Sequence, residues 1–140
     1  MATYQTYNDG RNIASASGAN AAGAPGRDIL VGEFNAGKRA LSTSDVVEVI
    51  NIPANTYVEQ VFVKVLAADA GASINVGDGA DPDGWGVGVS VAATDVLHDA
   101  DAAFNASAKF YTADDTIDIT ATGTLDTARV RVYAVCSLLG

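Results

Sequence analysis

From residue 28 onward, the chain is a series of short apolar segments with an alternating pattern, separated by Gly, Asp, Asn and Pro. Three such segments are Tyr57–Ala67, Thr116–Thr122 and Ala128–Val135. Alternation with a period of two is typical of β-strands, and Val and Ile favour them. Glu and Lys, which long helices use heavily, occur only three times each. The sequence therefore predicts an all-β fold of about eight strands, an antiparallel β-sandwich or jelly roll.

The alternation also assigns residues to the two faces of a strand. In the segment that begins at Tyr57, it predicts that Tyr57, Val61, Val63 and Val65 share the buried face. Val58 then falls on the opposite face of the same strand.

Charge and composition exclude several classes of protein. The chain has 140 residues, with 8 basic and 17 acidic side chains, so its formal net charge is −9. Phosphate repels such a chain, and no nucleic acid partner is expected. No apolar run approaches the roughly 20 residues that cross a membrane, so no membrane partner is expected either. The N-terminus lacks the basic and apolar regions of a secretion signal, which predicts a protein made in the cytoplasm.

Residues 1–27 differ in composition from the rest of the chain. Small residues, Gly and Pro fill this stretch, and neither a helical nor a strand period persists in it. We interpret it as an extended N-terminal arm that precedes a β-sandwich domain of residues 28–140. Tyr4, Tyr7 and Ile13 are its candidate anchors and interface residues. A terminus without fixed contacts is the alternative.

The sequence offers little that could catalyse a reaction. Its one histidine, His98, lies in an Asp-rich segment, and there is no Gly-x-Ser-x-Gly nucleophile motif. The surrounding segment Thr94–Phe104 fits either a short helix or a loop with one helical turn. The single cysteine, Cys136, falls on the inward side of the last strand and is predicted to be a buried structural thiol. We therefore expect a protein that is not an enzyme and that uses no cofactor.

The loop Gly77–Gly86 is the most distinctive local motif. It contains Asp78, Asp81 and Asp83, whose oxygens are suitable ligands for calcium, although their spacing is not that of an EF-hand. A tight cluster of turns explains the same residues without a metal, because Asp and Gly favour turn geometry, and we favour this interpretation. Trp85, the only tryptophan, is predicted to cap one end of the sandwich or to contribute to an interface. Stacking on a sugar is the alternative.

Three segments carry a family resemblance, and their order along the chain is part of it. They are Ile74–Trp85, Tyr111–Thr120 and Ala128–Ala134. Over about residues 45–135, the chain resembles small structural proteins of tailed bacteriophages, especially those that decorate or cement the head. The resemblance implies a non-enzymatic β-domain that self-associates, binds the outside of a phage capsid and stabilises it by bridging coat subunits.

The resemblance also implies partners and a location. The partners are the major capsid protein of the same virion and further copies of this chain, with a homotrimer favoured over a homodimer. The location is the capsid exterior, after synthesis in the host cytoplasm. An extended arm could lie over a neighbour and add a strand to its sheet. Two other functions stay open: a phage tail or fibre module, and a stand-alone carbohydrate- or calcium-binding domain that would use Asp78, Asp81, Asp83 and Trp85.

Overall fold

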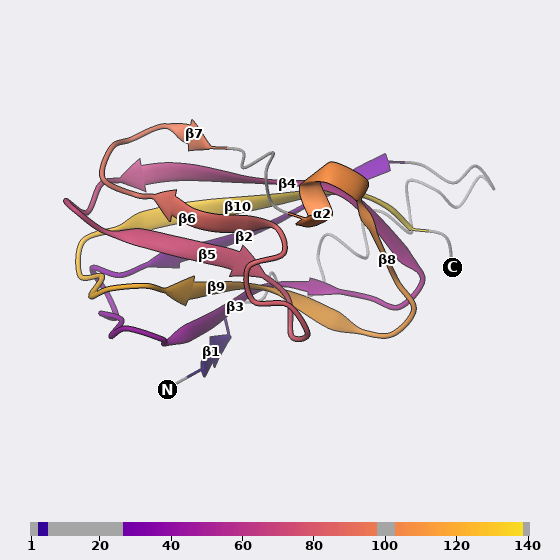
Figure 1. The fold of residues 1–140 in the computed structure, drawn as a ribbon, viewed down its shortest axis with the longest axis horizontal. Helices are drawn as coiled ribbons and strands as arrows, with labels where there is room; N and C mark the ends of the chain where they lie inside the picture. Colours follow the sequence, from indigo (N-terminus) through magenta and orange to yellow (C-terminus); the bar gives the residue numbers. More distant parts are fainter. Residues whose placement is uncertain (1–2, 6–26, 98–102, 139–140) are drawn as a thin grey trace.

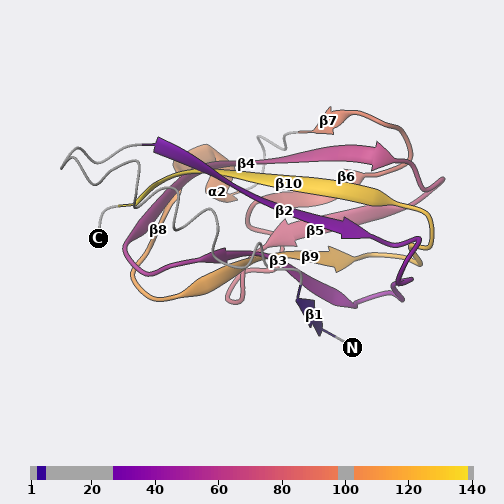
Figure 2. The ribbon, with the colours of Figure 1, turned by 180° about the vertical axis from the view of Figure 1, so that it is seen from behind.

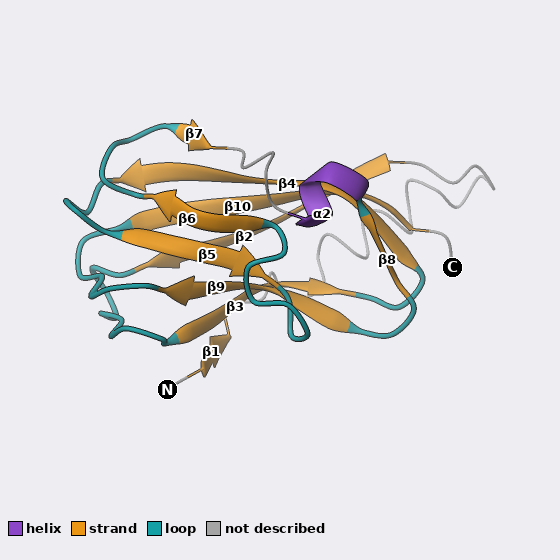
Figure 3. Ribbon diagram, viewed as in Figure 1, coloured by secondary structure: helices purple, strands orange, loops and turns teal. Residues whose placement is uncertain are grey.

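The structure is a computed structural model, and it describes residues 3–5, 27–97 and 103–138. It shows two β-sheets packed face to face, with one short helix near one end (Figures 1 and 3). The predicted all-β, two-sheet architecture is confirmed, whereas jelly-roll connectivity stays a prediction. No helix among the described residues is long and apolar enough to cross a membrane.

The elements follow one another along the chain as β1 (Thr3–Gln5), β2 (Arg27–Asn35), β3 (Val46–Ile52), β4 (Thr56–Ala67), β5 (Ser73–Gly77), β6 (Gly86–Ser90), β7 (Val96–Leu97), α2 (Ala103–Ser107), β8 (Lys109–Tyr111), β9 (Asp115–Ala121) and β10 (Arg129–Leu138). Sheet A has the strand order β1-β3-β9-β5-β6, and sheet B has the order β2-β10-β4-β7, with β8 also paired to β4. Figure 2 shows both layers from behind. Among the described strands, every pair is antiparallel except β1 with β3, which is parallel.

The core fills the space between the inner faces of the two sheets. Val47 and Ile119 from sheet A and Val132 from sheet B are completely buried. Cys136 is also completely buried, which confirms the inward assignment of its side chain. Burial raises the pKa of this thiol to about 12, so it stays protonated and unreactive at neutral pH.

The face assignment for the start of β4 is wrong. Cys136 pairs with Val58 and the preceding Val135 pairs with Gln60, which leaves Glu59 as an extra residue in a β-bulge. An extra residue reverses which face the next side chain occupies. Val58 is therefore buried and Tyr57 points to the outer face, whereas the assignment is correct beyond the bulge, at Val61, Val63 and Val65.

A second bulge lies in β3, where this strand contacts β2 of the other sheet. The register of β3 shifts between Glu48 and Ile50, so that Val49 and Ile50 are both buried. The backbone of Gly32 in β2 packs against this bulge: a Cβ at Gly32 would lie 1.9 Å from the carbonyl oxygen of Val49. Only glycine permits such a close approach, and β2 of sheet B contacts β3 of sheet A there.

The structure locates the ends of two predicted segments. β2 begins at Arg27, one residue before the predicted start of the domain. The segment 94–104 is not one helix, because Val96–Leu97 forms strand β7 and the helix α2 begins only at Ala103. His98 lies outside the described residues, as do Tyr7 and Ile13, and Tyr4 lies within β1.

Candidate functional site

The Asp-rich loop between β5 and β6 is a compact set of turns. The Oδ1 atom of Asp78 accepts hydrogen bonds from the backbone amides of Ala80 and Asp81, at 3.0 and 2.9 Å. The amide of Asp78 in turn donates to the carbonyl of Asp81 at 2.9 Å. Gly77 sits so close to this turn that a Cβ there would lie 2.1 Å from the same carbonyl oxygen. The Gly and Asp residues of the motif are therefore used to build the loop.

The other oxygen of Asp78 faces the interior of the protein. Its Oδ2 atom is 2.6 Å from Nζ of Lys109 and accepts a hydrogen bond of 2.7 Å from the hydroxyl of Tyr111. Burial acts to raise the pKa of Asp78, but the hydrogen bonds from Lys109, Tyr111 and the loop amides outweigh it, and the pKa lies below its ordinary value. Asp78 is thus a buried carboxylate that keeps its charge because β8 supplies a counterion.

Aromatic side chains enclose this ion pair. The indole nitrogen of Trp85 donates to the Tyr111 hydroxyl at 3.0 Å. The ring of Phe104, from α2, meets the Trp85 ring edge to face with centroids 5.3 Å apart. Nζ of Lys109 lies 4.4 Å from the centre of the Phe104 ring and 4.8 Å from that of Tyr111, in cation–π geometry. We call Asp78, Trp85, Phe104, Lys109 and Tyr111 the end cluster.

Trp85 lies buried within the end cluster. The residue is only 1% exposed, so its ring packs against the core, whereas its role at an interface stays a prediction. Asn105 of α2 donates to the carbonyl of Trp85 and accepts from the amide of Val61 at 3.2 Å. The helix, the loop and β4 are thereby held together.

The three aspartates of the loop do not converge on one point. Asp78 points inward to Lys109, whereas Asp81 is half-buried and Asp83 is exposed. A hydrogen bond with Asp83 is the main cause that raises the pKa of Asp81. Among the residues that the structure describes, no three His, Cys, Asp or Glu side chains form a group that could hold a metal ion. A cation at Asp78 would have to displace Lys109.

Sequence reasoning missed a buried acid on the outer face of sheet A. Asp118 in β9 is only 6% exposed and accepts a hydrogen bond of 2.6 Å from the hydroxyl of Thr116. It lies directly opposite Glu48 of β3. Burial raises its pKa to about 6, and the negative charges of Glu48 and Asp115 add to the effect. The alternation of β9 predicts an outward side chain here, but nothing in the sequence indicates that it is covered.

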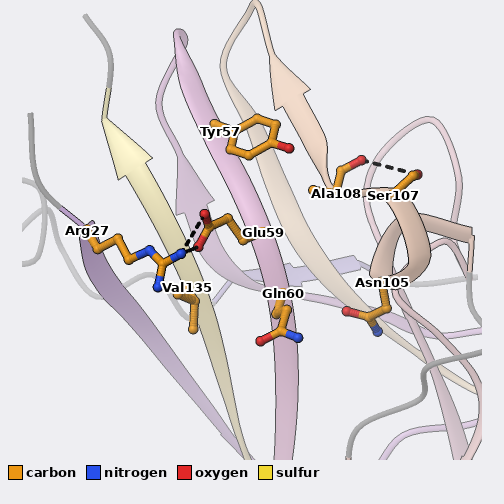
Figure 4. Close-up of a pocket in the computed structure, with 8 residues that line it drawn as sticks. All are labelled: Arg27, Tyr57, Glu59, Gln60, Asn105, Ser107, Ala108 and Val135. Atoms are coloured by element: carbon orange, nitrogen blue, oxygen red, sulfur yellow. Dashed lines mark hydrogen bonds and ion pairs between the residues drawn. The ribbon is translucent and has the colours of Figure 1, made fainter.

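An open groove lies on the outer face of sheet B, beside α2. It encloses about 420 Å³ and is lined by Arg27, Tyr57, Glu59, Gln60, Asn105, Ser107, Ala108 and Val135. Figure 4 shows the Arg27–Glu59 ion pair, 2.9 Å long, on one side and the end of α2 on the other. The sequence could not predict this groove, because the bulge at Glu59 turns the Tyr57 side chain toward it.

Comparison with known proteins gives matches only at the level of structure. No family model and no curated protein matches the chain. One similar structure is the capsid of Ralstonia phage GP4, with a TM-score of 0.61 and 13% identity over 82% of this chain and 85% of the other. A second is the capsid asymmetric unit of cyanophage Pam1, with a TM-score of 0.58 and 15% identity over 81% and 86%.

A third similar structure is the acid-stable capsid of Helicobacter pylori bacteriophage KHP30, with a TM-score of 0.53 and 13% identity over 81% of this chain and 87% of the other. In all three cases the match covers most of both chains, so the likeness extends beyond a single pair of strands. Identities this low show a shared fold. The chain therefore has a two-sheet fold that occurs in the capsid structures of three bacteriophages.

Proposed function

We propose that this chain is a non-enzymatic structural protein of a bacteriophage virion, which binds the outside of the capsid and bridges coat subunits. The observation that carries the proposal is the shared fold with chains in three phage capsid structures, over 81–82% of this chain. The sequence resemblance to decoration proteins of tailed phages supports the more specific role on the capsid surface.

The proposed mechanism is mass action. A protein that binds the assembled shell better than its separate subunits stabilises the shell in proportion to that preference. The expected partners are the major capsid protein and two further copies of this chain in a homotrimer. The end cluster suits such a role, because its ion pair, hydrogen bond and ring contact tie α2, β8 and the loop to one another.

Co-sedimentation with phage heads tests the proposal. Purified chain is mixed with expanded and with unexpanded heads of the phage that encodes it, and the protein that sediments with the heads is measured. Heads that already carry this protein at all of its sites serve as the control. Saturable binding to at least one bare form is expected, together with a higher temperature of head disruption. Failure to bind both bare forms would overturn the proposal.

A melting scan tests the alternative of a calcium-binding domain. On the proposed function, the melting temperature in calcium equals that in EDTA, because Lys109 already neutralises Asp78. A rise in calcium that disappears in an Asp81→Asn variant would instead support a calcium site in the loop and count against the turn interpretation.

A further inference from the structure

The edge of sheet A carries a strand from the far N-terminus. β1 pairs with β3 in parallel, with Thr3 opposite Val46, Tyr4 opposite Val47 and Gln5 opposite Glu48. In the strand order of sheet A, β1 comes first and has β3 as its one neighbour. The pairing involves only three residues of β1. Their backbone groups cover an edge of β3 that would otherwise be open to another chain.

The connection between this strand and the rest of the sandwich is long. Twenty-one positions, 6–26, separate Gln5 from Arg27, where β2 begins in sheet B. Figures 1 and 2 both show β1 and the start of β2 at different corners of the sandwich. At about 3.3 Å per residue, this length of chain reaches up to roughly 70 Å, which is enough to reach a neighbouring molecule.

The hydrogen bonds between β1 and β3 are the same whether both strands belong to one chain or to two. The choice then depends on concentration, because pairing between chains competes with pairing inside one chain, for which linkers in general give an effective concentration of up to the order of a millimolar. Exchange of an identical element between copies is a low-cost route to association. Exchange therefore competes with pairing inside one chain when copies are held at a local concentration of the same order.

We propose that β1 of one copy pairs with β3 of a second copy in this same parallel register, so that neighbouring copies exchange their N-terminal strands. The acceptor is the edge formed by Val46–Glu48, and the occupant is residues 3–5 of the other chain. Strand exchange would then be the contact between copies in the proposed function. It depends on that function only because binding to a capsid brings many copies close together.

Disulfide trapping tests this exchange with isolated protein. Opposed positions on paired strands lie at a separation that a disulfide can span. The double variant Thr3→Cys, Val46→Cys is oxidised at micromolar concentration, where a bond within one chain is expected. The single variants Thr3→Cys and Val46→Cys are then mixed at about 1 mM, and peptide mapping is expected to find a bond between positions 3 and 46 of different chains.

The matched control is Thr3→Cys mixed with Ser90→Cys, an exposed position on β6 at the opposite edge of sheet A. Little bond formation is expected there, and the buried Cys136 does not interfere. Strand exchange would be overturned if the double variant forms its disulfide within one chain but the mixed single variants form no more disulfide between chains than the control does. A double variant that fails to close would overturn the pairing itself. Binding of the unmodified chain to heads is measured separately, so neither result bears on capsid binding.

Discussion

Asp78 and Lys109, 31 positions apart in the sequence, form an ion pair of 2.6 Å in which the aspartate side chain has no exposed surface. The pair joins the β5–β6 loop to β8 and hence sheet A to sheet B. Removal of one partner from a buried pair leaves an uncompensated charge, which costs more than the pair itself contributes.

Lys109→Met is therefore expected to lower the free energy of unfolding by about 3 kcal/mol. Urea unfolding followed by Trp85 fluorescence measures the loss, since Trp85 belongs to the same cluster. Adding Asp78→Asn to Lys109→Met is expected to recover part of it. Lys38→Met, at an exposed position, serves as the control. Equal stability of Lys109→Met and Lys38→Met would show that the ion pair is unimportant.

Asp118 gives the stability of the fold a dependence on pH. Burial raises its pKa to about 6 from an ordinary 3.8, so between these values the folded chain holds a proton that the unfolded chain releases. The contribution of this proton to stability is complete below about pH 4 and is lost as the pH rises through 6.

Asp118→Asn removes this loss, because the amide stays neutral and its oxygen still accepts from Thr116. Relative to the parent chain, we expect a gain of about 2–3 kcal/mol at pH 7.5 and no gain near pH 4. Chemical unfolding of both proteins across that range measures the difference, with the exposed Asp126→Asn as control. A gain that is independent of pH, or none at pH 7.5, contradicts the assignment.

Val63 tests the face assignment of β4 beyond its bulge. The side chain is 3% exposed, and an unpaired carboxylate there is very costly to bury, so Val63→Asp is expected to abolish cooperative folding. Val96→Asp, on the neighbouring β7 and 57% exposed, is expected to melt like the parent chain. Circular dichroism melting curves distinguish the two. A cooperative transition in Val63→Asp would mean that this face does not point into the core.

Deletion of residues 1–26 tests the arm. The truncated chain keeps Arg27, which pairs with Glu59, and keeps every strand from β2 to β10. We expect it to fold with nearly the parent melting temperature but to bind heads and associate with itself more weakly. An unfolded product, or one that binds as well as the full chain, would contradict a separate arm that serves assembly.

Local alternation made most of the fold predictable. Val63 and Cys136 point inward as the pattern requires, because a strand places successive side chains on opposite faces. The pattern failed at the extra residue, because the bulge at Glu59 exchanges the faces of Tyr57 and Val58. No Gly or Pro adjoins Glu59, so the sequence does not indicate a bulge there.

The end cluster could be predicted only in part. The turns around Asp78 follow from the residue types of the loop, but its partner Lys109 comes from a strand far along the chain. Trp85 is buried, but its hydrogen bond to Tyr111 depends on how the two sheets pack, which the sequence around it does not show. Asp118 and the groove beside α2 depend on neighbours in space, and alternation within one strand contains no such information.

Electron microscopy of the parent virion tests the central claim most directly. The account predicts density with this two-sheet fold on the outer surface of the capsid, in contact with neighbouring coat subunits and grouped in threes. Density of this fold confined to the tail, or a fully resolved outer capsid surface without it, would contradict the proposed role.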